Sequence, residues 1–253
     1  MREIAAAFLA GDLTVLINMR SLNPRSILVF LGLVSVMAVS APVRALDLAS
    51  LSNKDTVAGL KEALVKGSQV AVNRLGIENG FMNDGRVKIP LPESLARAES
   101  LMRSVGMGKY ADELVLRMNR AAEAAVPEAK ALLVNSIKQM SVQDAKGILT
   151  GGDDAATRYF RRTTTEPMSQ IFLPIVKKAM EKVKFADKYN EFAEHGVRFG
   201  LVKAEDANLE KYITRRALDG LYLVIAEEEK KIRADPMGSA SSIISKVFGV
   251  LKK

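Results

Sequence analysis

Apolar and polar positions of the chain recur at the three- and four-residue spacing of amphipathic helices. The clearest case begins at Met107, where apolar side chains recur up to Ala125 while charged residues, beginning with Lys109, occupy the opposite face. Alanines dominate the apolar face, so a neighbouring helix can approach closely. Pro127 should bend or end this helix before the pattern continues over 128–140.

The same periodicity predicts further helices over 55–75, 92–105 and 208–233. Ser141 followed by Asp144 is typical of a capping box, and it predicts a short helix that ends near Gly151. Turn-forming Asn-Gly, Asp-Gly and proline signals interrupt the pattern over 76–92. These features predict an all-α fold, a compact multi-helix bundle over 46–236 with one short extended loop segment near 80–92.

The first part of the chain is typical of a cleavable secretory signal. Arg20 and Arg25 precede an apolar run over 27–39, and Val43 and Ala45 occupy the two small-residue positions before a cleavage site. A run of that length is too short for a hydrocarbon core of about 30 Å, which needs about 20 helical residues. Cleavage is therefore expected rather than anchoring.

We expect residues 1–45 to form this leader, with translation starting at Met19 and the mature periplasmic chain beginning at Leu46. The chain has no cysteine, which excludes a disulfide or a lipid-modified cysteine. Without the four arginines and two acidic residues of 1–45, the net charge falls from +8 to +6. Charges of both signs alternate along the chain, so no nucleic-acid partner is predicted.

The most unusual segment is TGGDDAATRYFRRTTT, residues 150–165. Its glycine pair should end one helix, and Asp153 or Asp154 should accept hydrogen bonds from the free amides of the next. A phosphate cradle is excluded because carboxylates stand where a glycine-rich lysine motif would be needed. A calcium loop is weakly supported, since no acidic residue follows until Glu166.

Arginines follow at helical spacing. Arg158 shares a face with Arg161 and Arg162, and Asp154 lies one turn before Arg158, which predicts an ion ladder. Asp219 is the single charge in ALDGLYLVIA, a segment that should lie at the centre of the bundle. A carboxylate there needs a partner, which would be Arg215 or an arginine of 158–162.

Two interpretations of these charges remain open. The favoured one is an internal salt-bridge network that fixes the register between two central helices. The other is a pocket for an anionic ligand, with cationic and aromatic walls, formed by Arg161, Arg162, Arg215 and Arg216 with Tyr159 and Tyr212.

Catalytic candidates are few, and no catalytic residue, metal site or cofactor is predicted. His195 is the only histidine, and no G-x-S-x-G motif is present. One histidine without cysteine argues against a transition-metal site. The run Glu227 to Glu229 is typical of a solvated helix end whose acids pair with Lys230, Lys231 and Arg233 one turn later.

The last residues, 237–253, have the pattern of a short basic amphipathic helix. They could contact an anionic membrane surface through 239–253, or pack on their own domain. Packing is the favoured interpretation.

Five separated segments resemble one family in the same order. They are KEALVKGSQVAVNRLG, KIPLPESLARAESLMRSVGMGKYADEL, MNRAAEAAVPEAK, ILTGGDDAATRYFRR and ALDGLYLVIAEEEKKIR. Together they are similar to the Gram-negative secreted family catalogued as domain of unknown function 4197. The resemblance implies a helical protein of the periplasm or outer envelope, and it implies no activity and no site residues.

The function expected from the sequence is binding within the cell envelope, with an apolar small molecule or lipid as the leading ligand class. Alanine-rich helix faces and eleven methionines suit adaptable apolar contacts. The alternatives are an adaptor for an unknown protein partner and a carboxylate-dependent hydrolase centred on Asp153, Asp154 or Asp219.

Overall fold

A computed structural model describes residues 53–181, 183–200 and 202–235. Contacts divide the chain into one unit of residues 1–45 and a second of residues 46–253, and the described residues belong to the second. The predictions about the leader and about 237–253 lie outside them. Within the described ranges every regular element is a helix, which confirms the all-α prediction. None of the described helices combines the length and hydropathy of a membrane span.

The described helices are α3 (Asn53–Leu75), η3 (Glu93–Leu95), α4 (Ala96–Ser104), α5 (Gly108–Ala125), η4 (Val126–Glu128), α6 (Ala129–Gln139), α7 (Val142–Leu149), α8 (Ala155–Met180), α9 (Lys184–Arg198), η5 (Ala204–Asp206) and α10 (Leu209–Ala234). Pro127 lies in the 3-10 turn between α5 and α6, as its missing N–H predicts. The Ser141 hydroxyl accepts a hydrogen bond from the N–H of Asp144, whose carboxylate accepts one from the N–H of Ser141. The predicted capping box is therefore confirmed.

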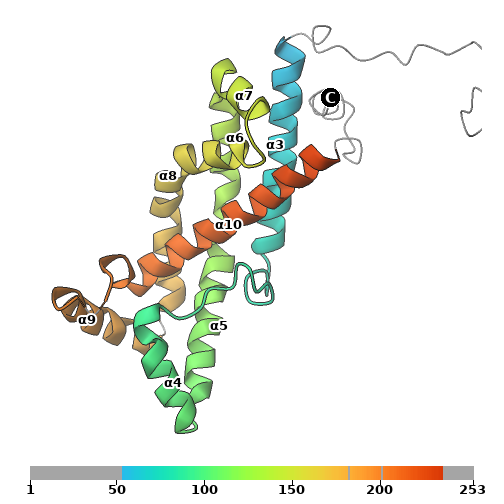
Figure 1. Ribbon diagram of the computed structural model, residues 1–253. Helices are drawn as coiled ribbons and strands as arrows, with labels where there is room; N and C mark the ends of the chain where they lie inside the picture. The colour runs from blue at the N-terminus through green and yellow to red at the C-terminus, as the bar shows by residue number, and fades with distance from the viewer. Residues whose placement is uncertain (1–52, 182, 201, 236–253) are drawn as a thin grey trace, which may run out of the picture. The chain divides into compact units, whose positions relative to one another are not determined.

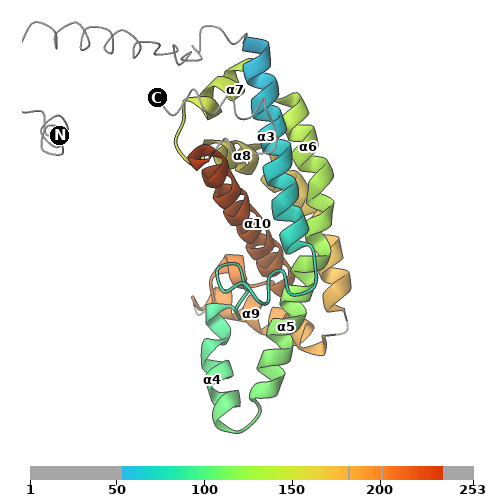
Figure 2. The same ribbon diagram turned by 90° about the vertical axis from the view of Figure 1, so that its right-hand side faces the viewer.

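Helix α10 lies at the centre of the bundle because apolar side chains surround most of its circumference. It packs against α8, α3 and α5, and Figure 1 shows it running obliquely across α8 and α5. Ile213, Leu221 and Val224 are fully buried in these contacts. Helix α3 packs on α6 and α7, and Figure 2 shows α3 and α6 side by side.

The loop over 76–92 is a series of turns that α5 holds from one side. The buried Asn119 amide accepts from the N–H of Ile89 at 2.9 Å and donates to the C=O of Ile89 at 2.9 Å and of Val115 at 2.7 Å. One turn later, Glu123 Oε1 accepts from the main-chain N–H of Phe81 at 3.0 Å. Two buried polar side chains thus satisfy main-chain groups that no sheet or helix would pair.

An ion network holds the same loop from the other side. Asp84 Oδ2 lies 2.6 Å from the guanidinium groups of both Arg74 and Arg86, and Arg86 Nη1 lies 2.5 Å from Glu227 Oε1. Hydrogen bonding to Arg86 lowers the pKa of the Asp84 carboxyl well below its usual range. The network joins α3, the loop and α10.

Helix α4 packs on α5 and η3, and Figure 2 shows α4 beside the first part of α5. Gly106 adopts a φ of 79° in the turn between them, and the N–H of Met107 donates to the C=O of Met102 at 2.7 Å. Around this turn large apolar side chains are exposed, among them Leu101, Val105, Met107 and Tyr110.

Candidate functional site

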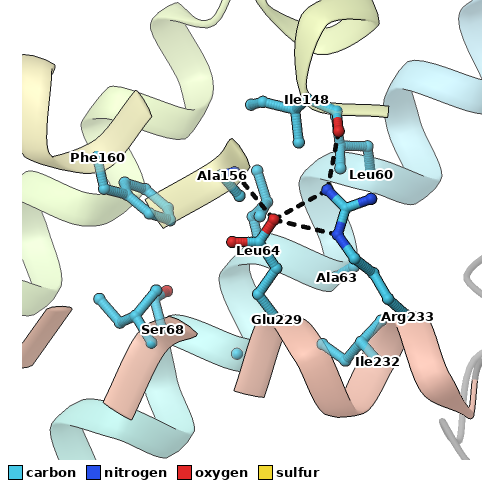
Figure 3. A pocket seen from close by; sticks show the side chains of 12 residues that line it. Leu60, Ala63, Leu64, Ser68, Ile148, Ala156, Phe160, Glu229, Ile232 and Arg233 are labelled. Carbon is cyan, nitrogen blue, oxygen red and sulfur yellow. Dashed lines mark hydrogen bonds and ion pairs between the residues drawn. The ribbon is translucent and has the colours of Figure 1, made fainter. Parts of the chain in front are cut away.

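Glu229 is a buried carboxylate that joins α10 to the start of α8. Its two oxygens accept hydrogen bonds from the N–H of Ala156 at 2.9 Å and from the N–H and hydroxyl of Thr157 at 3.0 and 2.9 Å. Arg233, one turn later, donates to Glu229 Oε1 from Nε and Nη2 (Figure 3). Because these side chains are only 6% and 14% exposed, the pair is shielded from solvent.

This arrangement corrects two predictions. Asp154 occupies the position before α8 but its side chain makes no capping hydrogen bond, because Glu229 already accepts from the first free amides. The acidic run at the end of α10 is not uniformly solvated, since Glu229 points into the bundle. A carboxylate with five donors at its oxygens is satisfied, and we assign it a structural role.

A small cavity adjoins this ion pair. It has a volume of about 20 Å³ and is bounded by side chains of α3, α7, α8 and α10. Figure 3 shows Leu60, Leu64 and Phe160 around it. That volume holds about one water molecule, so the cavity as described does not admit an acyl chain.

A larger open groove of about 460 Å³ runs between α8 and α10. Its lining is Arg161, Thr165, Glu166, Ser169, Leu173, Lys211, Thr214, Arg215, Leu218, Asp219 and Tyr222. We call it the α8/α10 groove. Charged, hydroxyl and apolar side chains alternate along both helices, so the groove can contact a ligand that has a charged part and an apolar part.

Arg161 and Asp219 form an ion pair across this groove, with 3.0 Å between Nη1 and Oδ1. The Arg161 guanidinium also lies 4.7 Å from the centre of the Tyr222 ring. The Tyr222 hydroxyl shares a hydrogen bond with Thr164 at 2.8 Å, and burial raises the pKa of this phenol. The ion pair, the cation–π contact and the hydrogen bond therefore all join α8 to α10 at one place.

A second open groove, of about 450 Å³, lies on the other side of Arg215, next to η5. Arg215 Nη2 lies 2.6 Å from Asp206 Oδ1, and its guanidinium lies 5.6 Å from the Tyr212 ring centre. The Tyr212 hydroxyl donates to the C=O of Pro90 at 3.0 Å. Arg216 also lines this groove and has no ion pair within the described ranges.

Comparison with known proteins adds one finding. The sequence profile of a family described as a protein of unknown function (DUF4197) matches residues 50–249. The chain belongs to the DUF4197 family. No curated protein and no solved structure is significantly similar to it. Membership in the DUF4197 family confirms the resemblance of the five segments and assigns no chemistry to either groove.

The structure brings together half of the residues that the sequence singled out. Arg161 of α8 and four residues in the first half of α10 line one groove or both. The four are Tyr212, Arg215, Arg216 and Asp219. The prediction that Asp219 pairs with an arginine is confirmed with Arg161. The prediction that this pair is internal is wrong, because the two side chains are 47% and 45% exposed.

The remaining predicted residues point elsewhere. Arg162 Nη2 pairs with Asp144 at 2.8 Å and its guanidinium lies over the ring of Tyr159, whose hydroxyl donates to the C=O of Ser136. Arg158 pairs with Asp154, as the ladder predicted. Asp153 is exposed. A single pocket formed by all four arginines is therefore not the observed arrangement.

The sequence analysis did not identify two residues that line the α8/α10 groove, Lys211 and Thr214. Thr214 is buried, and its Oγ1 is the one buried side-chain polar atom within the described ranges that has no hydrogen-bond partner. Helical spacing places both residues on the face that carries Arg215 and Leu218. That spacing was visible in the sequence, but which face meets a groove was not.

Proposed function

We propose that this protein is a binding protein of the cell envelope that holds an apolar or lipid-like ligand in the α8/α10 groove. The observation that supports the proposal is the composition of the groove. Leu173, which is partly exposed, supplies apolar surface beside the nearly buried Leu218 and Tyr222, while Arg161 and Lys211 supply charge. An amphiphile presents both kinds of surface, and a sugar or a free metal ion does not.

The envelope location is supported by the sequence. An arginine-flanked apolar run precedes small residues at Val43 and Ala45. Release by osmotic shock, followed by mass spectrometry, would detect a chain that begins at Leu46. A chain retained in the cytoplasm at full length would contradict this part of the proposal.

The binding function is tested by mass spectrometry of organic extracts from natively purified protein. Ser169→Phe places a ring in the groove and should remove the co-purified ligand. Ser100→Phe adds the same ring to an exposed position of α4 and should leave the extract unchanged. A parent protein that yields no lipid-like compound would overturn the proposal.

A second candidate, an adaptor for a protein partner, is favoured by the turn between α4 and α5. Leu101, Val105 and Tyr110 are 65%, 61% and 52% exposed, and such apolar clusters often mark contact surfaces. A photocrosslinking residue at Val105 should give a discrete heteromeric band in intact cells. The same residue at the exposed Arg117 is the control, and no difference between the two would remove this candidate.

A further inference from the structure

We infer that the ligand of the α8/α10 groove carries an anionic headgroup, a carboxylate or phosphate attached to an apolar chain, and that Lys211 and Thr214 bind this headgroup. The inference rests on the proposed function and deepens it. It assigns a chemical class to the ligand and a location to its charge.

The first observation is the unpaired hydroxyl of Thr214. Other hydroxyls in the groove donate to their own helix, Thr165 to the C=O of Arg161 at 2.7 Å and Ser169 to the C=O of Thr165 at 2.9 Å. Thr214 is only 4% exposed and has no such partner among the described residues. A buried hydroxyl without a partner is costly, and an acceptor oxygen of a ligand would remove that cost.

The second observation is the Lys211 ammonium group on the same helix face as Thr214. Lys211 precedes it by three residues and Arg215 follows it, so all three lie on one face of α10. Lys211 is exposed and forms no ion pair within the described ranges. Arg215 directs its guanidinium to Asp206 and Glu205, which leaves its methylene stem along the groove.

The carboxylates of the groove do not pair with Lys211 within the described ranges. Asp219 pairs with Arg161, and Glu166 accepts a hydrogen bond from Gln170 at 3.1 Å. Arg161 and Arg215 are both engaged in ion pairs, so Lys211 is the cation of the groove that no carboxylate of the described residues pairs with. The hydroxyl donor and an ammonium group on one helix face are suited to an anion.

The third observation is the apolar surface beyond this face. Leu173, which is partly exposed, lies across the groove on α8, and the nearly buried Leu218 lies one turn after Thr214 on α10. An anion bound at Lys211 and Thr214 would therefore have apolar surface next to it. A free inorganic anion buries no apolar surface when it binds there, whereas the apolar chain of an amphiphile does, and this burial stabilises the complex.

Calorimetry with the delipidated full chain separates the inference from the proposed function. The probes are decanoate, decanol, decyltrimethylammonium, acetate and inorganic phosphate. Decanoate should bind roughly tenfold or more tightly than the other two decyl compounds, since hydrogen bonds to charged groups are strong. Acetate and phosphate should not bind in the same concentration range.

Each other outcome has one meaning. Equal binding of the three decyl compounds would overturn the headgroup inference and leave the proposed function standing. No binding of any decyl compound would overturn both. Binding of acetate or phosphate as tight as that of decanoate would overturn the amphiphile and indicate a site for free anions.

Substitutions locate the headgroup. Thr214→Val keeps the shape of the side chain and removes its hydroxyl, and Lys211→Gln removes the ammonium. Both should weaken decanoate binding by roughly tenfold and leave decanol binding unchanged. Lys130→Gln, at an exposed position of α6, is the matched control. Loss of decanol binding in Thr214→Val, or full decanoate binding in both variants, would contradict the assignment.

Discussion

Glu229 accepts hydrogen bonds from both the N–H and the hydroxyl of Thr157, although 72 residues separate them in the chain. The carboxylate does for α8 what a local capping side chain normally does. Since Glu229 belongs to α10, the start of one long helix depends on the position of the other. This contact makes the packing of α8 on α10 specific in register.

Removing this carboxylate should destabilise the fold. Glu229→Ala removes the carboxylate that pairs with the partly buried Arg233 and frees the first amides of α8, and we expect a loss of about 3–5 kcal/mol in urea unfolding. Glu128→Ala, at an exposed position, should change stability by less than about 0.5 kcal/mol. The double variant Glu229→Met, Arg233→Met tests the cap separately. If the double variant recovered the full stability of the parent protein, the loss in Glu229→Ala would come from the ion pair alone and not from the cap of α8.

Gly220 should tolerate no larger side chain. A Cβ there would lie 2.7 Å from Phe81 Cε1 and 3.2 Å from Val87 Cβ, so Gly220→Ala should cost about 1–3 kcal/mol through overpacking. Gly147→Ala is the matched control, because Gly147 is an exposed position of α7 and nothing lies within 4 Å of a Cβ there. It should stabilise the protein by up to about 1 kcal/mol. Equal thermal stability of the two variants would contradict the close packing.

Asn119 should control the loop over 76–92. Asn119→Leu removes both hydrogen bonds to Ile89 and one to Val115, and we expect a loss of about 2–4 kcal/mol. Hydrogen exchange at the Ile89 amide should become faster than at amides of α8. Asn135→Leu, at an exposed position of α6, should leave that exchange rate unchanged. An unaltered Ile89 amide in the first variant would remove the assigned role.

Acid should weaken the Asp84 network. Hydrogen bonding to Arg86 lowers the pKa of the Asp84 carboxyl in the folded protein below its ordinary value of 3.8. The unfolded chain therefore takes up this proton first, so the contribution to stability is present above pH 3.8 and is lost progressively as the pH falls below it. Asp84→Asn should flatten the decline of unfolding free energy between about pH 4 and 2.

Asp153→Asn is the control for this experiment, because it removes the same charge from an exposed side chain. Its acid limb should follow that of the parent. If Asp84→Asn also retained the parent's acid limb, the ion network would have no measurable role in stability.

The helices themselves were determined by the sequence. The spacing of apolar residues after Met107, the proline at 127 and the Ser141 capping box predicted α5, α6 and α7 close to their observed bounds. These features depend on residues within four positions of one another, so they can be recognised along the chain. The same holds for the ion pair between Arg158 and Asp154.

The direction of each charged side chain was decided by the tertiary structure. Glu227, Glu228 and Glu229 are consecutive and chemically alike, yet the first pairs with Arg74 and Arg86, the second with Lys231, and the third caps α8. Each residue of a helix points about 100° away from the last. Which direction meets solvent depends on where the neighbouring helices lie.

Asp219 illustrates the same reason in the opposite sense. Its apolar neighbours in the chain predicted burial, but Leu223, one turn later on the same face, is also exposed. That face of α10 is open because the helices against which α10 packs cover its other sides. The sequence by itself therefore determined a bundle of helices with paired charges. Only the packing of those helices decided that Arg161 and Asp219 meet at an open groove and that Glu229 is enclosed.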